Sequence, residues 1–307
     1  MRRYIILAML LLAACNEQTA VPVNIANPFI GGTEGLSISF QDLPPEVFDG
    51  GTSPFDVVIR LENKGEALVS KENTRIRLSG INPLEFSKTT EQLSSSAPDD
   101  LIEVRKDAQG NRIQPPLVFA EFTNFNYKSK LAGASNQFII RADACYQYKT
   151  RSVSKLCVRE NILNPKPGGI CEINGDKPSF SSSAPVQIGA FKESTRAKDK
   201  IGFTFEVINI GRGSVFGKNT VCDSNRQNEN KVYLTITTSL PGLQCTGLES
   251  NPTGAQGPVT LYGGSKIVSC TQPVSTSSDF EQIVTIEAVY DYEESTQTSL
   301  TVKNSGE

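Results

Sequence analysis

The residues best suited to chemistry are the seven cysteines. Cys15 follows a short apolar run near the start, and the other six lie at Cys145, Cys157, Cys171, Cys222, Cys245 and Cys270. The six contain no Cys-x-x-Cys pair, and their separations fit no common zinc pattern. An even number of cysteines in an exported chain instead predicts disulfides.

Histidine is absent from all 307 residues, and so is tryptophan. Because histidine is the usual general base and a common zinc ligand, Ser-His-Asp, Cys-His and His-metal catalysis are excluded. Paired carboxylates for glycoside hydrolysis stay open, since 33 acidic residues always offer candidates, but no pair stands out. We therefore expect no catalytic residue, no metal and no cofactor.

The cysteine pairing is predicted from strand geometry. If residues 137–148 and 152–158 form a hairpin centred on Arg151, Cys145 lies opposite Cys157. The prediction is a Cys145–Cys157 disulfide. Cys171 then bonds Cys222, Cys245 or Cys270, and we favour Cys171–Cys222 with Cys245–Cys270.

The first 14 residues predict a secretory signal peptide, with two arginines, an apolar run and small residues before Cys15. The run is too short to cross a bilayer, which takes roughly 20 residues. Leu12-Ala13-Ala14-Cys15 resembles the lipobox of bacterial lipoproteins, which implies lipidation of the Cys15 sulfur and cleavage before it. An ordinary cleaved signal with a chance cysteine is the alternative. Residues 15–32 would be a lipidated tether that anchors an exported protein at the cell surface or in the periplasm.

Composition predicts an ordinary soluble body, with 38% hydrophobic and 21% charged residues. The net charge is −3 and the basic residues are scattered, so no nucleic-acid partner is expected.

Short runs rich in Val, Ile, Phe, Tyr and Thr, separated by Gly, Pro, Asn and Ser clusters, predict an all-β fold. The expected strands are 36–40, 55–61, 74–78, 117–123, 137–148, 152–158, 185–191, 201–208, 231–238, 258–262, 265–270, 281–292 and 296–302.

An internal repeat divides these strands into two sets. Residues 144–158 align without gaps on residues 288–302, an offset of 144 residues that keeps two tyrosines in register. Asn63-Lys-Gly65 and Asn209-Ile-Gly211 form a second match. We expect two tandem immunoglobulin-like antiparallel β-sandwich domains, at 33–160 and 181–307, joined by a linker at 161–180.

Alternation predicts which faces are buried. The expected core face carries Ile140, Ala142, Ala144, Tyr146 and Tyr148, with Val284, Ile286, Ala288, Tyr290 and Tyr292 as counterparts. The opposite face, expected to meet water, carries Arg141, Asp143, Gln147, Thr285, Glu287 and Asp291.

The Asn-x-Gly turn after a long strand resembles the cell-adhesion-related domain found in bacteria (CARDB) and kindred immunoglobulin-like surface modules. The layout is also similar to uncharacterised secreted proteins of archaea with small genomes. The resemblance implies a surface protein and supplies no activity. The Asn and Gly residues themselves are expected to form turns rather than to bind ligand.

Several loops carry polar residues without a specific motif. Residues 211–219 resemble a phosphate loop, but the spacing is one residue short and the following helix is missing. Asp223, Asn225, Asn228, Glu229 and Asn230, like Asp99, Asp100 and Glu103, offer calcium-type oxygens but lack an EF-hand pattern. The Ser-rich segment 84–116 is the best candidate binding surface, with a passive excursion as the alternative.

These observations predict a non-enzymatic, lipid-anchored extracytoplasmic protein with a structural or adhesion role at the cell envelope. Its partners would be the membrane, through the lipid, and a protein or envelope polymer. The alternative is a ligand-binding subunit that captures a carbohydrate or peptide for an envelope enzyme or transporter.

Overall fold

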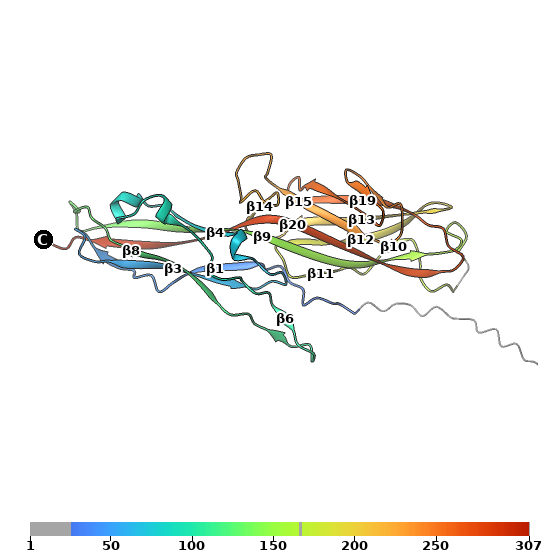
Figure 1. The fold of residues 1–307 in the computed structure, drawn as a ribbon, viewed down its shortest axis with the longest axis horizontal. Helices are drawn as coiled ribbons and strands as arrows, with labels where there is room; N and C mark the ends of the chain where they lie inside the picture. Colours follow the sequence, from blue (N-terminus) through green and yellow to red (C-terminus); the bar gives the residue numbers. More distant parts are fainter. Residues whose placement is uncertain (1–25, 166–167, 307) are drawn as a thin grey trace, which may run out of the picture.

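The computed structural model describes residues 26–165 and 168–306, and Figure 1 shows an elongated molecule built almost wholly of strands. The sheets are antiparallel apart from one short parallel pair, which confirms the expected all-β sandwich class. Three short 3-10 helices interrupt the strands, at Lys71–Asn73, Pro83–Phe86 and Glu91–Leu93.

Two strands run along most of the molecule. β9 (Ser135–Val158) and β20 (Phe280–Lys303) have 24 residues each and pair antiparallel from end to end. At a rise of about 3.3 Å per residue, this ladder is roughly 80 Å long. Figure 1 shows the two strands side by side along the horizontal axis, in green and red.

The hairpin expected at Arg151 does not form, because the chain continues straight through it. Residues 137–148 and 152–158 are parts of one strand, and 281–292 and 296–302 are parts of another. The bridging residues have no Gly or Pro to turn the chain, and Thr150 at the bridge is fully buried opposite Ala288. Burial and cross-strand pairing keep the chain extended there.

In the ladder of β9 and β20, equivalent residues of the two repeats are related by a local two-fold symmetry. Gln147 lies opposite Asp291, and these two positions are also 144 residues apart, so they are equivalent in the repeat. On either side, Tyr146 faces Tyr292 and Tyr148 faces Tyr290. A pseudo-two-fold axis therefore passes between Gln147 and Asp291, at the middle of the molecule.

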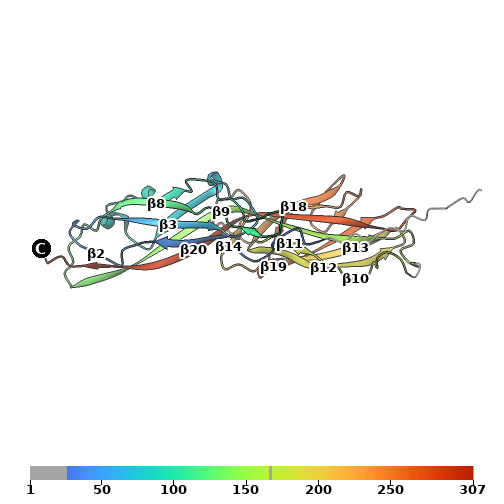
Figure 2. The same cartoon turned by 90° about the horizontal axis from the view of Figure 1, so that it is seen from below.

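The described residues form three large sheets and one two-stranded sheet. The central ten-stranded sheet contains β9 and β20 together with β17 (Glu249–Asn251), β18 (Gly254–Thr260), β15 (Lys231–Thr237), β4 (Thr74–Ser79), β5 (Ser94–Ser96), β2 (Glu46–Phe48), β11 (Phe180–Ser181) and β14 (Ser214–Phe216). A three-stranded sheet at the end that holds the carboxyl terminus contains β1 (Leu36–Gln41), β3 (Phe55–Asn63) and β8 (Val118–Phe125). A five-stranded sheet at the other end contains β10 (Gly175–Asp176), β12 (Val186–Ala197), β13 (Lys200–Asn209), β19 (Ser265–Pro273) and β16 (Gln244–Cys245). Figure 2 shows these strands lying along the same long axis.

The two halves share strands. β4 pairs with β9 as β15 pairs with β20, and β1 pairs with β3 as β12 pairs with β13. Each half of the central sheet holds one half of β9 and one half of β20. The expected boundary at residue 160 therefore leaves residues 147–158 paired with β20 in the second half, alongside β15.

The expected core face is confirmed. All ten predicted positions are at most 1% exposed, from Ile140 to Tyr148 and from Val284 to Tyr292. Two of the six positions expected to meet water are instead buried, Asp143 at 5% and Asp291 at 3% exposure. Each carboxylate is tied to neighbouring side chains or backbone, as described below.

Candidate functional site

Four tyrosines gather at the two-fold axis. Strand parity brings Tyr146 and Tyr148 from β9 against Tyr290 and Tyr292 from β20, with ring centroids 5.7 to 6.3 Å apart. All four are fully buried, at 1% exposure or less. Buried hydroxyls need hydrogen-bond partners, so their partners show what the cluster does.

Two of the hydroxyls accept a hydrogen bond from the first residue of a strand, one in each half of the molecule. The Leu36 N–H donates to Tyr146 Oη at 3.2 Å, and the Val186 N–H donates to Tyr290 Oη at 3.3 Å. Leu36 begins β1 and Val186 begins the equivalent strand β12. Thr150 Oγ1 also lies 3.0 Å from Tyr290 Oη.

The other two hydroxyls lie under the Asn-x-Gly turns. Asn63 Oδ1 accepts the Gly65 N–H at 3.1 Å, and Asn209 Oδ1 accepts the Gly211 N–H at 3.2 Å. A Cβ on Gly65 would lie 1.9 Å from Tyr148 Oη, and a Cβ on Gly211 would lie 2.1 Å from Tyr292 Oη. Both turns thus require glycine for close approach, which confirms that these residues form turns.

The tyrosine cluster is structural. Burial raises the pKa of Tyr146, Tyr148 and Tyr290, and it raises the pKa of Tyr292 to about 12. The hydroxyls remain protonated at neutral pH and are occupied by backbone partners. Through these bonds the cluster holds the first residues of β1 and β12 against the paired strands β9 and β20.

A groove of about 510 Å³, here called the waist groove because it lies at the middle of the molecule, opens beside this cluster between β1 and β20. One wall is formed by residues 33–38, the other by the turn at residues 210–212, and the floor by Tyr292 and residues 294–296 of β20. A second hollow of about 400 Å³ continues from it past Arg212 to Arg141 and Gln297.

The groove holds charge. Glu34, Glu294 and Arg212 line it, and Glu34 lies 3.7 Å from Lys64. Burial raises the pKa of the Glu294 carboxyl, an effect that Arg212 partly offsets. A half-buried carboxylate of this kind favours a ligand that brings a positive charge.

The outer face of the ladder carries a hydrogen-bonded network instead of free acids. Asp143 Oδ1 accepts bonds of 2.6 Å from both Arg141 Nε and Ser295 Oγ. Asp291 accepts the backbone N–H groups of Asn219, Thr220 and Val221 at 2.7 to 3.1 Å. These bonds explain why the two aspartates are buried where alternation predicted solvent.

Within the described residues, three disulfides pair the six cysteines that were expected to be oxidised, but two of the predicted pairings are wrong. The bonds are Cys145–Cys222, Cys157–Cys171 and Cys245–Cys270. Only Cys245–Cys270 was expected. Cys145 and Cys157 cannot meet because they lie on one continuous strand, 12 residues and about 40 Å apart. Three disulfides indicate an oxidising, extracytoplasmic compartment.

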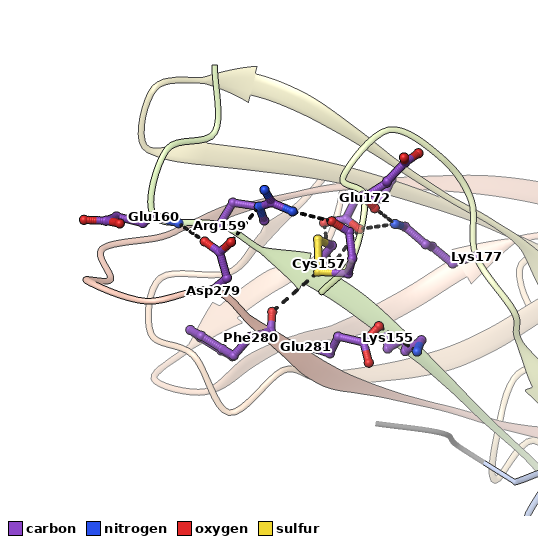
Figure 3. The surroundings of a disulfide bond; sticks show 11 residues. Lys155, Cys157, Arg159, Glu160, Glu172, Lys177, Asp279, Phe280 and Glu281 are labelled. Atoms are coloured by element: carbon purple, nitrogen blue, oxygen red, sulfur yellow. Dashed lines mark hydrogen bonds and ion pairs between the residues drawn. A yellow bond between two sulfur atoms is a disulfide. The ribbon is translucent and has the colours of Figure 1, made fainter. Parts of the chain in front are cut away.

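Charged residues surround the Cys157–Cys171 disulfide (Figure 3). Arg159 donates to the Cys171 carbonyl at 2.7 Å and pairs with Asp279 at 2.9 Å. Beside Cys157, the Glu193 carboxylate accepts the Cys157 N–H at 2.9 Å and pairs with Lys177 at 3.1 Å.

Glu193 is the most deeply buried acid of this group, with a side chain that is 0% exposed. Burial raises the pKa of its carboxyl to about 7, although the Cys157 N–H and Lys177 favour the charged form. The Glu193 carboxylate ties β12 to β9 beside the disulfide, through its bond from the Cys157 N–H.

The acidic loop residues that offered calcium-type oxygens are bonded to neighbouring residues of the chain. Asp223 accepts the Asn225 N–H and an Asn228 Nδ2 bond, both at 3.2 Å. Asp100 accepts the Lys71 N–H at 2.9 Å, and Glu103 pairs with Arg105 at 2.6 Å. Among the described residues, no group of three or more acidic or cysteine side chains is arranged to hold a metal.

The segment 84–116 is partly a cover for the core and partly an arm. Phe86, Leu93 and Leu101 are buried. The short strands β6 (Arg105–Lys106) and β7 (Arg112–Ile113) form an exposed hairpin that projects from the body in Figure 1. Its tip is closed by Asp107, whose Oδ1 accepts the Gln109 and Asn111 N–H groups.

Cys15 and the signal peptide lie outside the described residues. Within the described part of the chain, no helix has the length and apolar character needed to cross a membrane.

The waist groove was not predicted from the sequence, because it is formed by residues from β1, a distant turn and β20 that only the two-fold arrangement brings together.

Comparisons with known proteins add no family. No family model and no curated protein matches the chain. Among solved structures, the chain is similar to the secreted serine protease VesC from Vibrio cholerae, with a TM-score of 0.20 and 11% identity over 83% of this chain. The chain spans half the length of that structure.

Proposed function

We propose that this protein is a non-enzymatic, lipid-anchored extracytoplasmic protein with a structural or adhesion role at the cell envelope. In this proposal Cys15 carries the lipid at the start of the tether predicted at residues 15–32, and the strand-built body is displayed beyond that tether. The body contributes stiffness and reach.

The observation that carries the proposal is the unbroken ladder of β9 and β20. Both strands pass through the middle of the molecule without a turn, and every residue of one is paired with the other. Flexible two-domain proteins place a linker at this point. Here the Cys145–Cys222 disulfide, the tyrosine cluster and the Asp291 bonds reinforce the same place.

Anchoring is tested by Cys15→Ser in cells that process lipoproteins. The proposal predicts that the unmodified chain fractionates with membranes and carries a lipid on its amino-terminal residue by mass spectrometry. Cys15→Ser should be exported but soluble. Membrane association that survives this substitution contradicts the anchor.

The structural role is tested by sedimenting the purified oxidised chain with isolated cell envelopes. Binding to envelopes, or ordered self-association, supports a structural or adhesion role. Tight binding of one defined soluble saccharide or peptide, without envelope binding, favours a second candidate function, a ligand-binding subunit that serves an envelope enzyme or transporter. The waist groove is the observation that favours this alternative.

A further inference from the structure

The outer edge of β20, the edge that faces away from β9, is open at the waist. β14 pairs with it as far as Glu293, and β2 pairs with it from Thr301 onward. Among the described residues, no strand pairs with this edge between Glu294 and Leu300. The first part of the open stretch, from Glu294 to Gln297, lines the waist groove and the adjoining hollow.

The backbone groups of this stretch alternate between the two edges. The Thr301 N–H points to the outer edge, where it donates to the Pro45 carbonyl at 3.0 Å. Alternate residues of an antiparallel strand direct their N–H and C=O groups to the same edge. Ser295, Gln297 and Ser299 therefore direct their backbone N–H and C=O groups to the open outer edge, as Thr301 does. An exposed row of this kind is a template for strand pairing.

The equivalent edge of β9, related by the pseudo-two-fold axis, is already paired with a strand of this chain, β11. On β9, the residues equivalent to Thr296 and Gln297 are Ser152 and Val153, 144 residues earlier, and both pair with β11. The chain around β11 also bonds Arg151, through the Ser182 N–H to its carbonyl at 2.8 Å. The same edge is therefore filled by an extended segment in one half and open in the other.

We propose that the open edge of β20 between Glu294 and Leu300 binds an extended, basic segment of a partner protein by strand addition. The new strand would pair with Ser295, Gln297 and Ser299. This is the peptide-recognition mode in which backbone bonds supply affinity and alternate side chains supply specificity.

The groove specifies the occupant's chemistry. Glu294, Thr296 and Thr298 are partly buried on the inner face of the strand, so the entering side chains must be small or polar there. Three acids, Glu34, Glu293 and Glu294, line the groove and the adjoining hollow against two cations, Arg141 and Arg212. Arg141 is already bonded to Asp143 and Ser295, so a lysine or arginine beside Glu294 is favoured. A second copy would offer the same edge with the same acids, Glu34 and Glu294, so it matches the charge of the site less well than a basic segment does.

This inference goes beyond the proposed function and does not depend on the lipid anchor. The probe is a synthetic peptide of residues 177–183 carrying Ser183→Lys, because the native segment occupies the equivalent edge of β9 and position 183 falls opposite the equivalent of Glu294. We expect the purified oxidised chain to bind it, with slowed hydrogen exchange at the Ser295, Gln297 and Ser299 amides.

Two pairs of comparisons locate the site. Gln297→Pro removes an N–H from the middle of the edge without removing a bond to β9, and it should weaken binding at least tenfold. Gln297→Ala keeps the N–H and should bind like the unmodified chain. Glu294→Gln should weaken binding of the lysine peptide while leaving binding of the native 177–183 sequence unchanged.

Three results would overturn the proposal. The first is slow exchange of the Ser295, Gln297 and Ser299 amides in the free chain, which would mean that the edge is already covered. The second is no peptide binding at millimolar concentration, or binding that Gln297→Pro leaves intact. The third is protection that rises with protein concentration alone, which would assign the edge to a second copy. The exchange measurement uses the unmodified chain and stands even if Gln297→Pro does not fold.

Discussion

At the scale of single residues, glycine and tyrosine determine the waist. Gly65 and Gly211 let the two Asn-x-Gly turns rest against Tyr148 and Tyr292, at distances that no side chain permits. The turn type was predictable from Asn and Gly alone. Their partners were not, because the tyrosines lie 83 and 81 residues further along the chain.

Substitution of Gly65 should therefore be costly. Gly65→Ala places a methyl group against the Tyr148 hydroxyl and the Glu34 and Ser183 carbonyls, and we expect it to lower the free energy of unfolding by about 2–3 kcal/mol. Gly189→Ala, within β12 and with nothing near the added carbon, is the matched control and should change it by less than about 1 kcal/mol. Denaturant titration measures both, and equal effects would contradict the close approach.

The raised pKa of Glu193 predicts how the stability of the fold changes with pH. Its pKa rises from an ordinary value of 4.5 to about 7 on folding, so the folded state binds more protons than the unfolded state between these pH values. Stability should fall as pH rises through this window, by about 3 kcal/mol or slightly more in total.

The measurement is the free energy of unfolding at pH 4.5 to 8. Glu193→Gln should flatten the slope, even though it removes the ion pair with Lys177 and lowers stability overall. Asp176→Asn, an exposed acid on the neighbouring strand, should leave the slope unchanged. A slope that persists in Glu193→Gln would assign the pH dependence to other groups.

At the scale of elements, the positions of strands were predictable and their continuity was not. The alternating pattern located residues on the buried face of β9 and β20 correctly. A turn at Arg151 was nevertheless expected, because it would place Cys145 opposite Cys157, and strands as long as 24 residues are uncommon. Pairing with β20 and burial of Thr150 kept the strand straight, and the cysteine pairing changed with it.

The disulfides should differ in their contribution to stability. Cys145–Cys222 closes a separation of 77 residues and Cys157–Cys171 one of 14, so the chain-entropy account predicts about 4.5 and 3 kcal/mol respectively. Paired Cys→Ala variants of each bond, compared by thermal unfolding, should follow this order. The reverse order would mean that strain or residual structure in the unfolded chain outweighs loop entropy.

At the scale of the whole molecule, β9 and β20 make one cooperative body from two repeated halves. Each half of the central sheet contains part of both strands, so neither half completes its sheet alone. We expect a single calorimetric unfolding transition, and we expect separate fragments 33–160 and 181–307 to fail to fold independently. Two separate transitions, or two well-folded fragments, would contradict shared strands.

The measurement that tests this account most directly is disulfide mapping of the secreted, oxidised chain by non-reducing proteolysis and mass spectrometry. Continuous β9 and β20 predict peptides joined as Cys145–Cys222, Cys157–Cys171 and Cys245–Cys270. A Cys145–Cys157 peptide would require β9 to fold back on itself at Arg151, and that result would contradict the ladder, the two-fold axis and the open edge together.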